Sequence, residues 1–131
     1  MNKYKKVMVI DDSEIDRYVA EMVMRNFAFA EEVICMESAQ DALEYLAGME
    51  NKPEELPHLI FLDINMPEMN GFDFLNAYGQ LSESIKKNCI IMMLTTSLDE
   101  EDRIKSTQNE YVCKFLNKPL DKEKLDKVDV K

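Results

Sequence analysis

The apolar residues of this chain are concentrated in five short segments separated by polar stretches. Three of the segments, residues 7–10, 59–62 and 89–94, are apolar without interruption, which is typical of strands buried on both faces. Two others, residues 32–36 and 112–116, are short and bounded by polar residues, and we interpret them as strands of the same sheet. The pattern therefore predicts five strands.

Between these segments, apolar residues recur at intervals of three and four, which indicates amphipathic helices. The first helix is predicted at residues 14–26, with Ser13 as its N-cap and Asp16 in its first turn, where a carboxylate interacts favourably with the helix dipole. Its apolar positions at helical spacing are Ile15, Val19, Met22 and Val23. Further helices are predicted after Ser38 and at residues 72–81, 99–106 and 121–130.

Strands that alternate with helices imply an α/β protein with a parallel sheet, because parallel neighbours need a crossover connection. Right-handed crossovers place helices on both faces of such a sheet. Residues 48–57 are polar and contain one Gly and two Pro, so we expect them to form the longest loop. Residues 79–88 are interpreted as a polar return to the sheet.

The length and charge of the chain restrict its class. A chain of 131 residues is the size of one domain and can bury a core without disulfides or a structural metal. The formal net charge of −10 argues against nucleic-acid binding, because the phosphate backbone would be repelled. No segment approaches the roughly 20 apolar residues of a membrane helix, and no apolar run fits a signal peptide. We therefore expect a cytoplasmic protein without a membrane partner.

The cysteines and the single histidine carry little functional signal. Cys35, Cys89 and Cys113 are odd in number, form no C-x-x-C motif and fall in apolar runs. We expect them to be small core residues in a reducing compartment rather than disulfides or zinc ligands. His58 precedes a predicted strand, and we interpret it as a residue that leads into this strand rather than as a catalytic one.

Four of the five predicted strands are followed by side chains capable of chemistry. They are Asp11 and Asp12 after the first strand, Asp63 after the third, Thr95 after the fourth and Lys118 after the fifth. The carboxyl ends of parallel strands meet at one edge of a sheet, and neighbouring strands lie about 4.8 Å apart. Asp63 alone would indicate only a loop cap, but the full set predicts one pocket in which these side chains converge.

The chemistry of this pocket follows from its charges. A pair of carboxylates about 4 Å apart repels by about 4 kcal/mol at intermediate dielectric, so cations must be present. Lys118 supplies one, and oxygen ligands with room for water indicate Mg²⁺ as the other. The two cations can neutralise the equatorial oxygens of a phosphoryl group, and Thr95 can donate a hydrogen bond to one of them. Asp63 is then the predicted nucleophile, which would form an aspartyl phosphate.

In this order and at this spacing, the residues resemble the motifs of response-regulator receiver domains, the family of the chemotaxis response regulator. The matching residues are the acidic pair Asp11 and Asp12, the phosphoacceptor Asp63, the hydroxyl residue Thr95 and the pair Lys118-Pro119. The resemblance extends along nearly the whole chain. It implies a flavodoxin-like, five-stranded parallel sheet in the order 2-1-3-4-5.

The resemblance also implies roles for individual residues. The implied Mg²⁺ ligands are Asp12, Asp63 and the backbone carbonyl of Asn65, with Asp11 acting mostly through water. The Lys118-Pro119 bond would be cis, which the energetics of X-Pro bonds permit. Phosphorylation would draw Thr95 and the aromatic Phe115 inward and alter the face formed by the fourth helix, fifth strand and fifth helix. For Phe115 the alternative is plain core packing.

The chain departs from the family pattern at three places. Thr96 follows Thr95 where a smaller residue is usual, so access of water or a phosphatase to the acyl phosphate would be reduced. Asn109-Glu110-Tyr111 stands where the family often has a Gly-Ala pair. The chain stops at Lys131, so we expect no DNA-binding output domain.

We therefore expect residues 1–131 to form a single, stand-alone receiver domain. It would take a phosphoryl group from a histidine kinase or phosphotransfer protein onto Asp63 and signal to a downstream protein target through a changed surface. Phosphorylation and dephosphorylation of its own Asp63 would not make it a turnover enzyme. The donor is expected to dock near Ile15, Tyr18 and Met22, a stripe of the first helix of which part should be core.

Two alternatives remain open. A Mg²⁺-dependent phosphatase similar to haloacid dehalogenases also forms an aspartyl phosphate. Such enzymes carry a second acid two residues after the nucleophile, where this chain has Asn65, and the chain has no room for a substrate cap. A phosphate-independent interaction module is the other alternative. The full set of strand-end residues argues against it, because such a module has no need of them.

Overall fold

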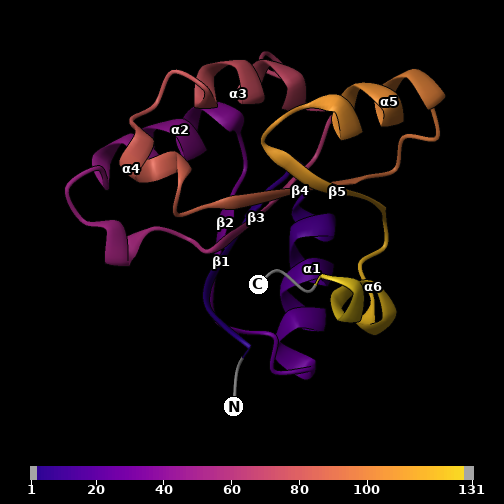
Figure 1. Ribbon diagram of the computed structural model, residues 1–131. Helices are drawn as coiled ribbons and strands as arrows, with labels where there is room; N and C mark the ends of the chain where they lie inside the picture. The colour runs from indigo at the N-terminus through magenta and orange to yellow at the C-terminus, as the bar shows by residue number, and fades with distance from the viewer. Residues whose placement is uncertain (1–2, 129–131) are drawn as a thin grey trace.

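The computed structural model describes residues 3–128, and Figure 1 shows how the chain is arranged around a single sheet. Five strands form this sheet in the order β2-β1-β3-β4-β5, and every neighbouring pair is parallel. The flavodoxin-like order implied by the resemblance is therefore confirmed. The strands are β1 (Tyr4–Ile10), β2 (Ala30–Met36), β3 (Leu59–Leu62), β4 (Ile90–Thr95) and β5 (Val112–Asn117).

Helices cover both faces of the sheet, as the alternating pattern predicts (Figure 1). One face carries α1 (Glu14–Asn26) and α6 (Lys122–Lys127). The other carries α2 (Ala39–Gly48), α3 (Gly71–Tyr78), α4 (Glu83–Lys86) and α5 (Glu100–Gln108), and a 3-10 turn, η1 (Pro53–Glu55), lies between α2 and β3. The last helix is predicted to reach residue 130; it ends at Lys127, and residues 129 and 130 lie outside the described residues.

Successive residues of the central strands alternate between two hydrophobic cores. The core beneath α2 and α3 contains Met8, Ile10, Ile60, Leu62, Ile91 and Met93. The core beneath α1 and α6 contains Val7, Val9, Leu59, Phe61, Met92 and Leu94. This alternation explains why residues 7–10, 59–62 and 91–94 are apolar at every position, because both faces of these segments are buried. It also fixes the central strands firmly, so the residues that follow them are held at defined places.

Beyond the bounds of the helices, α4 and α1 differ from the sequence prediction. The polar return at residues 79–88 contains the short helix α4, whose only strongly apolar side chain, Ile85, is fully buried and anchors it to the core. In α1, two of the predicted packing positions are wrong: Ile15 is 73% exposed and Met22 is 43% exposed. The helix instead buries Ala20 and Met24, because apolar residues occupy two of its faces and only one can meet the sheet.

The cysteines confirm their prediction only in part. Cys89 is buried and Cys35 is half-buried, but Cys113 is exposed, because β5 is an edge strand with one side open to solvent. Burial raises the pKa of Cys35 to about 11 and that of Cys89 to about 12. His58 immediately precedes β3, where its amide donates a hydrogen bond to the carbonyl of Lys6. Within residues 3–128, none of the helices has the length and apolar character needed to cross a membrane.

Candidate functional site

Backbone hydrogen bonds that continue the sheet place two aspartates at its carboxyl edge. The amide of Asp11 donates to the carbonyl of Met36 at 3.0 Å, and the amide of Asp63 donates to the carbonyl of Ile10 at 3.0 Å. Each aspartate therefore sits one step beyond the last residue of a central strand. The buried strands thus fix the backbone from which both side chains project.

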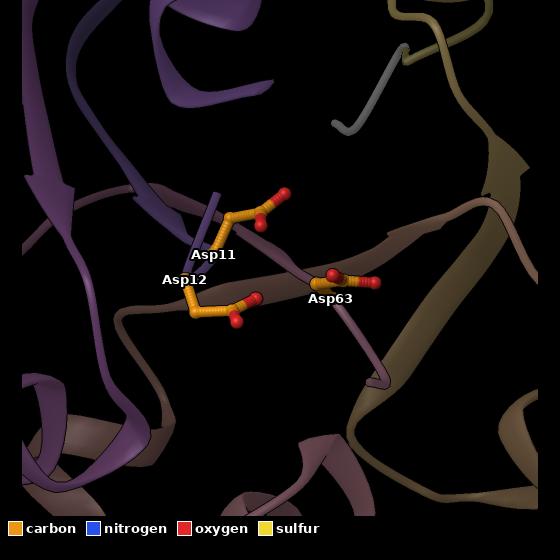
Figure 2. A group of neighbouring side chains, drawn as sticks. All are labelled: Asp11, Asp12 and Asp63. Atoms are coloured by element: carbon orange, nitrogen blue, oxygen red, sulfur yellow. The ribbon is translucent and has the colours of Figure 1, made fainter. Parts of the chain in front are cut away.

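Three carboxylates gather at this edge, as Figure 2 shows for Asp11, Asp12 and Asp63. One oxygen atom from each lies within 4.8 Å of the others. Asp11 and Asp63 are buried, whereas Asp12 is exposed and borders on solvent. The structure therefore brings together the three acids that the sequence places after two separate strands.

Lys118 reaches the same cluster from the end of β5. Its ammonium Nζ lies 2.6 Å from Asp11 Oδ2, 2.7 Å from Asp16 Oδ2 and 3.3 Å from Asp63 Oδ2. The peptide bond between Lys118 and Pro119 is cis, and the Lys118 amide donates to the carbonyl of Thr95 at 2.9 Å. Burial alone would lower the pKa of Lys118, but hydrogen bonds to Asp11 and Asp16 and the charge of Asp63 raise it well above its ordinary value. Lys118 is thus a permanent cation at neutral pH.

Asp11 is the most enclosed of the acids. Burial raises the pKa of Asp11 above its ordinary value, while hydrogen bonds from Lys118 and from the amide of Ser13, 2.9 Å away, oppose the shift. Arg17 donates from Nη1 to the carbonyl of Asp11 at 2.7 Å and lies 3.8 Å from Glu37. The start of α1 is thereby tied to the end of β1.

Asp63 is held by the chain that follows it. Its Oδ1 accepts a hydrogen bond from the amide of Ile64 at 2.8 Å, while Oδ2 faces Lys118. The loop then returns to Gly71, whose amide donates to the carbonyl of Ile64 at 2.8 Å. A Cβ atom at Gly71 would lie 2.6 Å from the carbonyl oxygen of Asp63, a distance that real contacts do not reach. A glycine is therefore required where this loop closes on Asp63.

Thr95 and its neighbours complete the edge at the end of β4. Thr95 is fully buried, and its Oγ1 accepts a hydrogen bond from the amide of Ser97 at 3.2 Å. Because the hydroxyl accepts this bond, its own hydrogen is available for donation to a ligand. Asn117 Nδ2 donates to the carbonyl of Ser97 at 3.0 Å, and Ser97 Oγ lies 2.7 Å from Asp102 Oδ2. These bonds tie the loop after β4 to both β5 and α5.

Two other predicted residues differ in their burial. Asn65 is exposed on the loop two residues beyond Asp63. Phe115 is half-buried in β5 and packs against the core beneath α2 and α3. Its partial exposure is compatible with core packing and with a side chain that changes its position.

Sequence reasoning missed the role of two residues at this site. Asp16 is assigned above only to the helix dipole, yet it forms one of the shortest ion pairs of Lys118. A signal was present, because α1 begins only a few residues after β1 and its first turn must lie at the same edge of the sheet. Gly71 marks the start of α3 in the sequence, but its contact with the backbone of Asp63 becomes visible only in the fold.

The stripe on α1 is a surface and not part of the core. Ile15, Tyr18 and Met22 are all exposed, Tyr18 by 63%. Asp16 lies within this segment and contacts Lys118, so the stripe starts beside the charged cluster. An exposed apolar stripe of this kind is a candidate contact surface for another protein.

The charges of the cluster fit a divalent cation. Asp11, Asp12, Asp16 and Asp63 formally carry four negative charges against the single positive charge of Lys118. Their donor atoms are carboxylate oxygens, which hard cations such as Mg²⁺ and Mn²⁺ prefer. Asp12 is exposed, so an ion can approach the cluster from solvent. The residues present are therefore suited to hold such an ion.

The fold and the site together define a class of protein. Five parallel strands in the order 2-1-3-4-5, with ionic side chains at the carboxyl edge, form a flavodoxin-like α/β domain with a site at the sheet edge where such folds bind ligands. The chain matches the family model described as response regulator receiver domain over residues 7–128. The chain belongs to this family, which confirms the resemblance noted in the sequence.

Individual relatives agree with this assignment. The two-component response regulator ORR1 of Oryza sativa subsp. japonica is 34% identical over 117 residues, which are 88% of this chain and 49% of ORR1. The chain thus spans about half the length of that relative. A crystal structure of a two-component response regulator from Cytophaga hutchinsonii has a TM-score of 0.88 at 28% identity. The superposed region covers 95% of this chain and 93% of the chain in that structure.

A further structural relative bears on the metal. The Mn²⁺-bound form of response regulator Rcp1 has a TM-score of 0.73 at 28% identity, with 94% of this chain and 87% of that chain covered. Receiver domains as a family bind divalent metal ions, in agreement with the acidic cluster. They act together with histidine kinases and phosphotransfer proteins in two-component signal transduction. The protein is accordingly a response-regulator receiver domain.

Proposed function

We propose that residues 1–131 form one receiver domain that accepts a phosphoryl group on Asp63 from a histidine kinase or a phosphotransfer protein. The observation that carries the proposal is the convergence of Lys118 on Asp11, 2.6 Å away, and on Asp63, 3.3 Å away, beside the exposed Asp12. A carboxylate that faces a fixed cation at a site with excess negative charge is suited to phosphoryl transfer.

In this proposal, Asp63 is the nucleophile. Hydrogen bonds from Ile64 to Oδ1 and from Lys118 to Oδ2 hold its carboxylate in one orientation before the donor arrives. One carboxylate oxygen forms a bond to phosphorus as the bond between phosphorus and the donor breaks, and the donor leaves with that electron pair. Lys118 remains protonated throughout, because its raised pKa keeps it a cation while negative charge develops on the phosphoryl oxygens.

The remaining residues have supporting roles. Asp11, Asp12, Asp63 and the backbone carbonyl of Asn65 are proposed to hold Mg²⁺, directly or through water. When bound, this ion supplies positive charge to the phosphoryl oxygens. Thr95 donates the hydrogen of its hydroxyl to a phosphoryl oxygen. Because the domain modifies only its own Asp63, we propose that it is not a turnover enzyme.

Two surfaces are proposed for partners. The phosphodonor would dock on the exposed stripe of Ile15, Tyr18 and Met22, which begins beside Lys118 and Asp16. The downstream target would bind the face formed by α5, β5 and α6, where movement of Thr95 and Phe115 changes the surface. Hydrogen bonds that link Ser97 to both Asn117 and Asp102 support this coupling, since they join the loop after Thr95 to β5 and α5.

The test is phosphorylation by a small acyl phosphate. The protein is incubated with acetyl phosphate and Mg²⁺, and its intact mass is measured. The expected result is a gain of one phosphate that requires Mg²⁺ and is absent in Asp63→Asn. Asp126→Asn is the matched control, because it removes an exposed aspartate on α6 that is not one of the clustered carboxylates.

Two outcomes would contradict the proposal. A chain that gains no mass, or an Asp63→Asn variant that still gains it, would exclude Asp63 as the phosphoacceptor. Multiple turnover on small phosphomonoesters would instead favour the phosphatase alternative. The same protein, treated with beryllium fluoride and compared with an untreated sample in a target pull-down, tests whether a partner distinguishes the two states.

A further inference from the structure

Lys118 is shared among carboxylates that differ in distance and in exposure. Asp16 Oδ2 lies 2.7 Å from its Nζ, closer than Asp63 Oδ2 at 3.3 Å. The side chain of Asp16 is 37% exposed, whereas those of Asp11 and Asp63 are 4% and 7% exposed. The acid outside the group expected from the family pattern is therefore the most solvated partner of Lys118 and one of its nearest.

The ammonium group has only three hydrogens to donate. Asp11, Asp16 and Asp63 provide three acceptors for them, and Nζ lies nearer to Asp11 and Asp16 than to Asp63. For Lys118 to move closer to a phosphoryl group on Asp63, its contact with Asp11 or Asp16 must therefore lengthen. Asp11 is poorly suited to release, because it would remain as a buried charge without its cation. Asp16 can turn to water at little cost, since it is partly exposed.

We propose that Asp16 is a positioning residue for Lys118 that restrains phosphoryl transfer. In the unphosphorylated protein, the Asp16 carboxylate draws the ammonium group away from Asp63, and it yields Lys118 to the phosphoryl group during transfer. This inference rests on the proposed function of Asp63 as phosphoacceptor. Ser13 supports the arrangement, because its Oγ accepts a hydrogen bond from the Asp16 amide at 3.2 Å and fixes this turn of α1.

The restraint slows two reactions, the phosphorylation of Asp63 and the hydrolysis of its aspartyl phosphate. Formation and hydrolysis of the aspartyl phosphate pass through transition states in which charge on the phosphoryl oxygens is stabilised by Lys118. Replacing the Asp16 carboxylate by an amide removes the competing charge and lets Lys118 approach Asp63. Both rate constants should therefore rise by a similar factor, about threefold to fivefold for loss of a partly exposed ion pair.

Rates of phosphorylation by acetyl phosphate and of subsequent dephosphorylation test the proposal in four proteins: the unsubstituted chain, Asp16→Asn, Asp16→Glu and Glu14→Gln. Asp16→Asn should accelerate both steps, and Asp16→Glu, which restores a carboxylate, should return both towards the original values. Glu14→Gln removes the same charge from the same exposed turn of the helix and should leave both unchanged. Unchanged or slower rates in Asp16→Asn, or equal acceleration in Glu14→Gln, would overturn the proposal.

A double-mutant cycle with Lys118→Met separates positioning from simple charge repulsion. If Asp16 acts through Lys118, the Asp16→Asn effect should disappear in the Lys118→Met background; an effect of the same size in both backgrounds would overturn the inference. Urea unfolding of the four proteins of this cycle needs no phosphoryl donor and should give non-additive midpoints, whereas additive midpoints would show that the pair does not interact. Failure of the proposed function is recognised separately, as absence of phosphate on the unsubstituted chain.

Discussion

Two lysines with largely buried side chains have contrasting surroundings in this domain. Lys6 lies on β1, where its Nζ is 3.0 Å from the carbonyl of Glu55 and 3.3 Å from the carboxylate of the same residue. Lys118 follows β5, where its Nζ meets carboxylates of three different residues within 3.3 Å. Both lysines therefore have acidic partners, but Lys6 forms an ion pair with one carboxylate and Lys118 with three.

The difference separates a structural ion pair from a reactive site. Lys6 and Glu55 balance each other one to one, and the Glu55 side chain is half exposed, so the pair needs no further ligand. Around Lys118 the negative charges exceed the positive one, which destabilises the folded protein unless a cation binds. Charge imbalance at a buried lysine, more than burial itself, thus marks the functional end of the sheet.

The largest expected effect comes from exchanging each lysine for methionine. Lys118→Met should slow phosphorylation of Asp63 by about 100-fold, because a fixed charge beside the phosphoryl oxygens is lost. Lys6→Met should change the rate by less than about twofold, since Lys6 forms its ion pair with Glu55 and not with Asp63. Phosphorylation kinetics with acetyl phosphate provide the measurement. Similar slowing in both variants would remove the distinction between the two lysines.

Metal binding at the cluster around Lys118 should stabilise the folded protein. Mg²⁺ at about 100 times its dissociation constant should raise the free energy of unfolding by about 2.7 kcal/mol, because it binds only the folded cluster. Asp12→Asn should abolish most of this gain, whereas Glu55→Gln should leave it intact. Thermal unfolding with and without Mg²⁺ measures the difference. Stabilisation that survives in Asp12→Asn would contradict the proposed ligands.

Two glycines extend the comparison to the backbone. Gly71→Ala should destabilise the fold by about 2 kcal/mol and slow phosphorylation, because its Cβ would clash with the Asp63 carbonyl at 2.6 Å. Gly48→Ala should have no such effect, since nothing lies within 4 Å of a Cβ at that position. Urea unfolding and acetyl phosphate kinetics test both variants. Equal behaviour of the two would show that the loop after Asp63 adapts freely.

The smallest effect is expected at alkaline pH. Burial lowers the pKa of either lysine, but hydrogen bonds to Glu55 for Lys6, and to Asp11 and Asp16 for Lys118, outweigh it and raise the folded pKa above 10.5. The stabilisation is complete below pH 10.5 and is lost as pH rises towards the folded pKa, by at most about 1.4 kcal/mol per pH unit for each lysine. Above this pH, the free energy of unfolding should fall less steeply with rising pH in Lys118→Met than in the unsubstituted protein. An unchanged dependence on pH would contradict the ion pairs of Lys118.

The sequence predicted the fold well because the strands are buried on both faces. Continuous apolar runs at residues 59–62 and 89–94 are short and bounded by polar or turn-forming residues, which favours buried strands over buried helices. Amphipathic positions were harder to predict. In α1 the periodicity includes Ile15 and Met22, which the structure exposes, because a helix with two apolar stripes does not reveal which stripe meets the sheet.

The site was predictable to the extent that its residues follow strands. Asp11, Asp63 and Lys118 could be grouped because parallel strands end at one edge. Asp16 could be placed near this edge from its position in the first turn of α1, but its contact with Lys118 depends on how that turn is rotated. Cys113 was misplaced for a related reason: an apolar segment does not state whether its strand lies at the centre or at the edge of a sheet.

The most direct test of the central claim is to locate the phosphoryl group. After treatment with acetyl phosphate and Mg²⁺, borohydride reduces an aspartyl phosphate to homoserine, and peptide mass spectrometry identifies the converted residue. We predict conversion of Asp63 alone, and its loss in Lys118→Met under the same brief exposure. Conversion of another carboxylate, such as Asp11 or Asp12, or of none, would contradict the assignment of Asp63 as the phosphoacceptor.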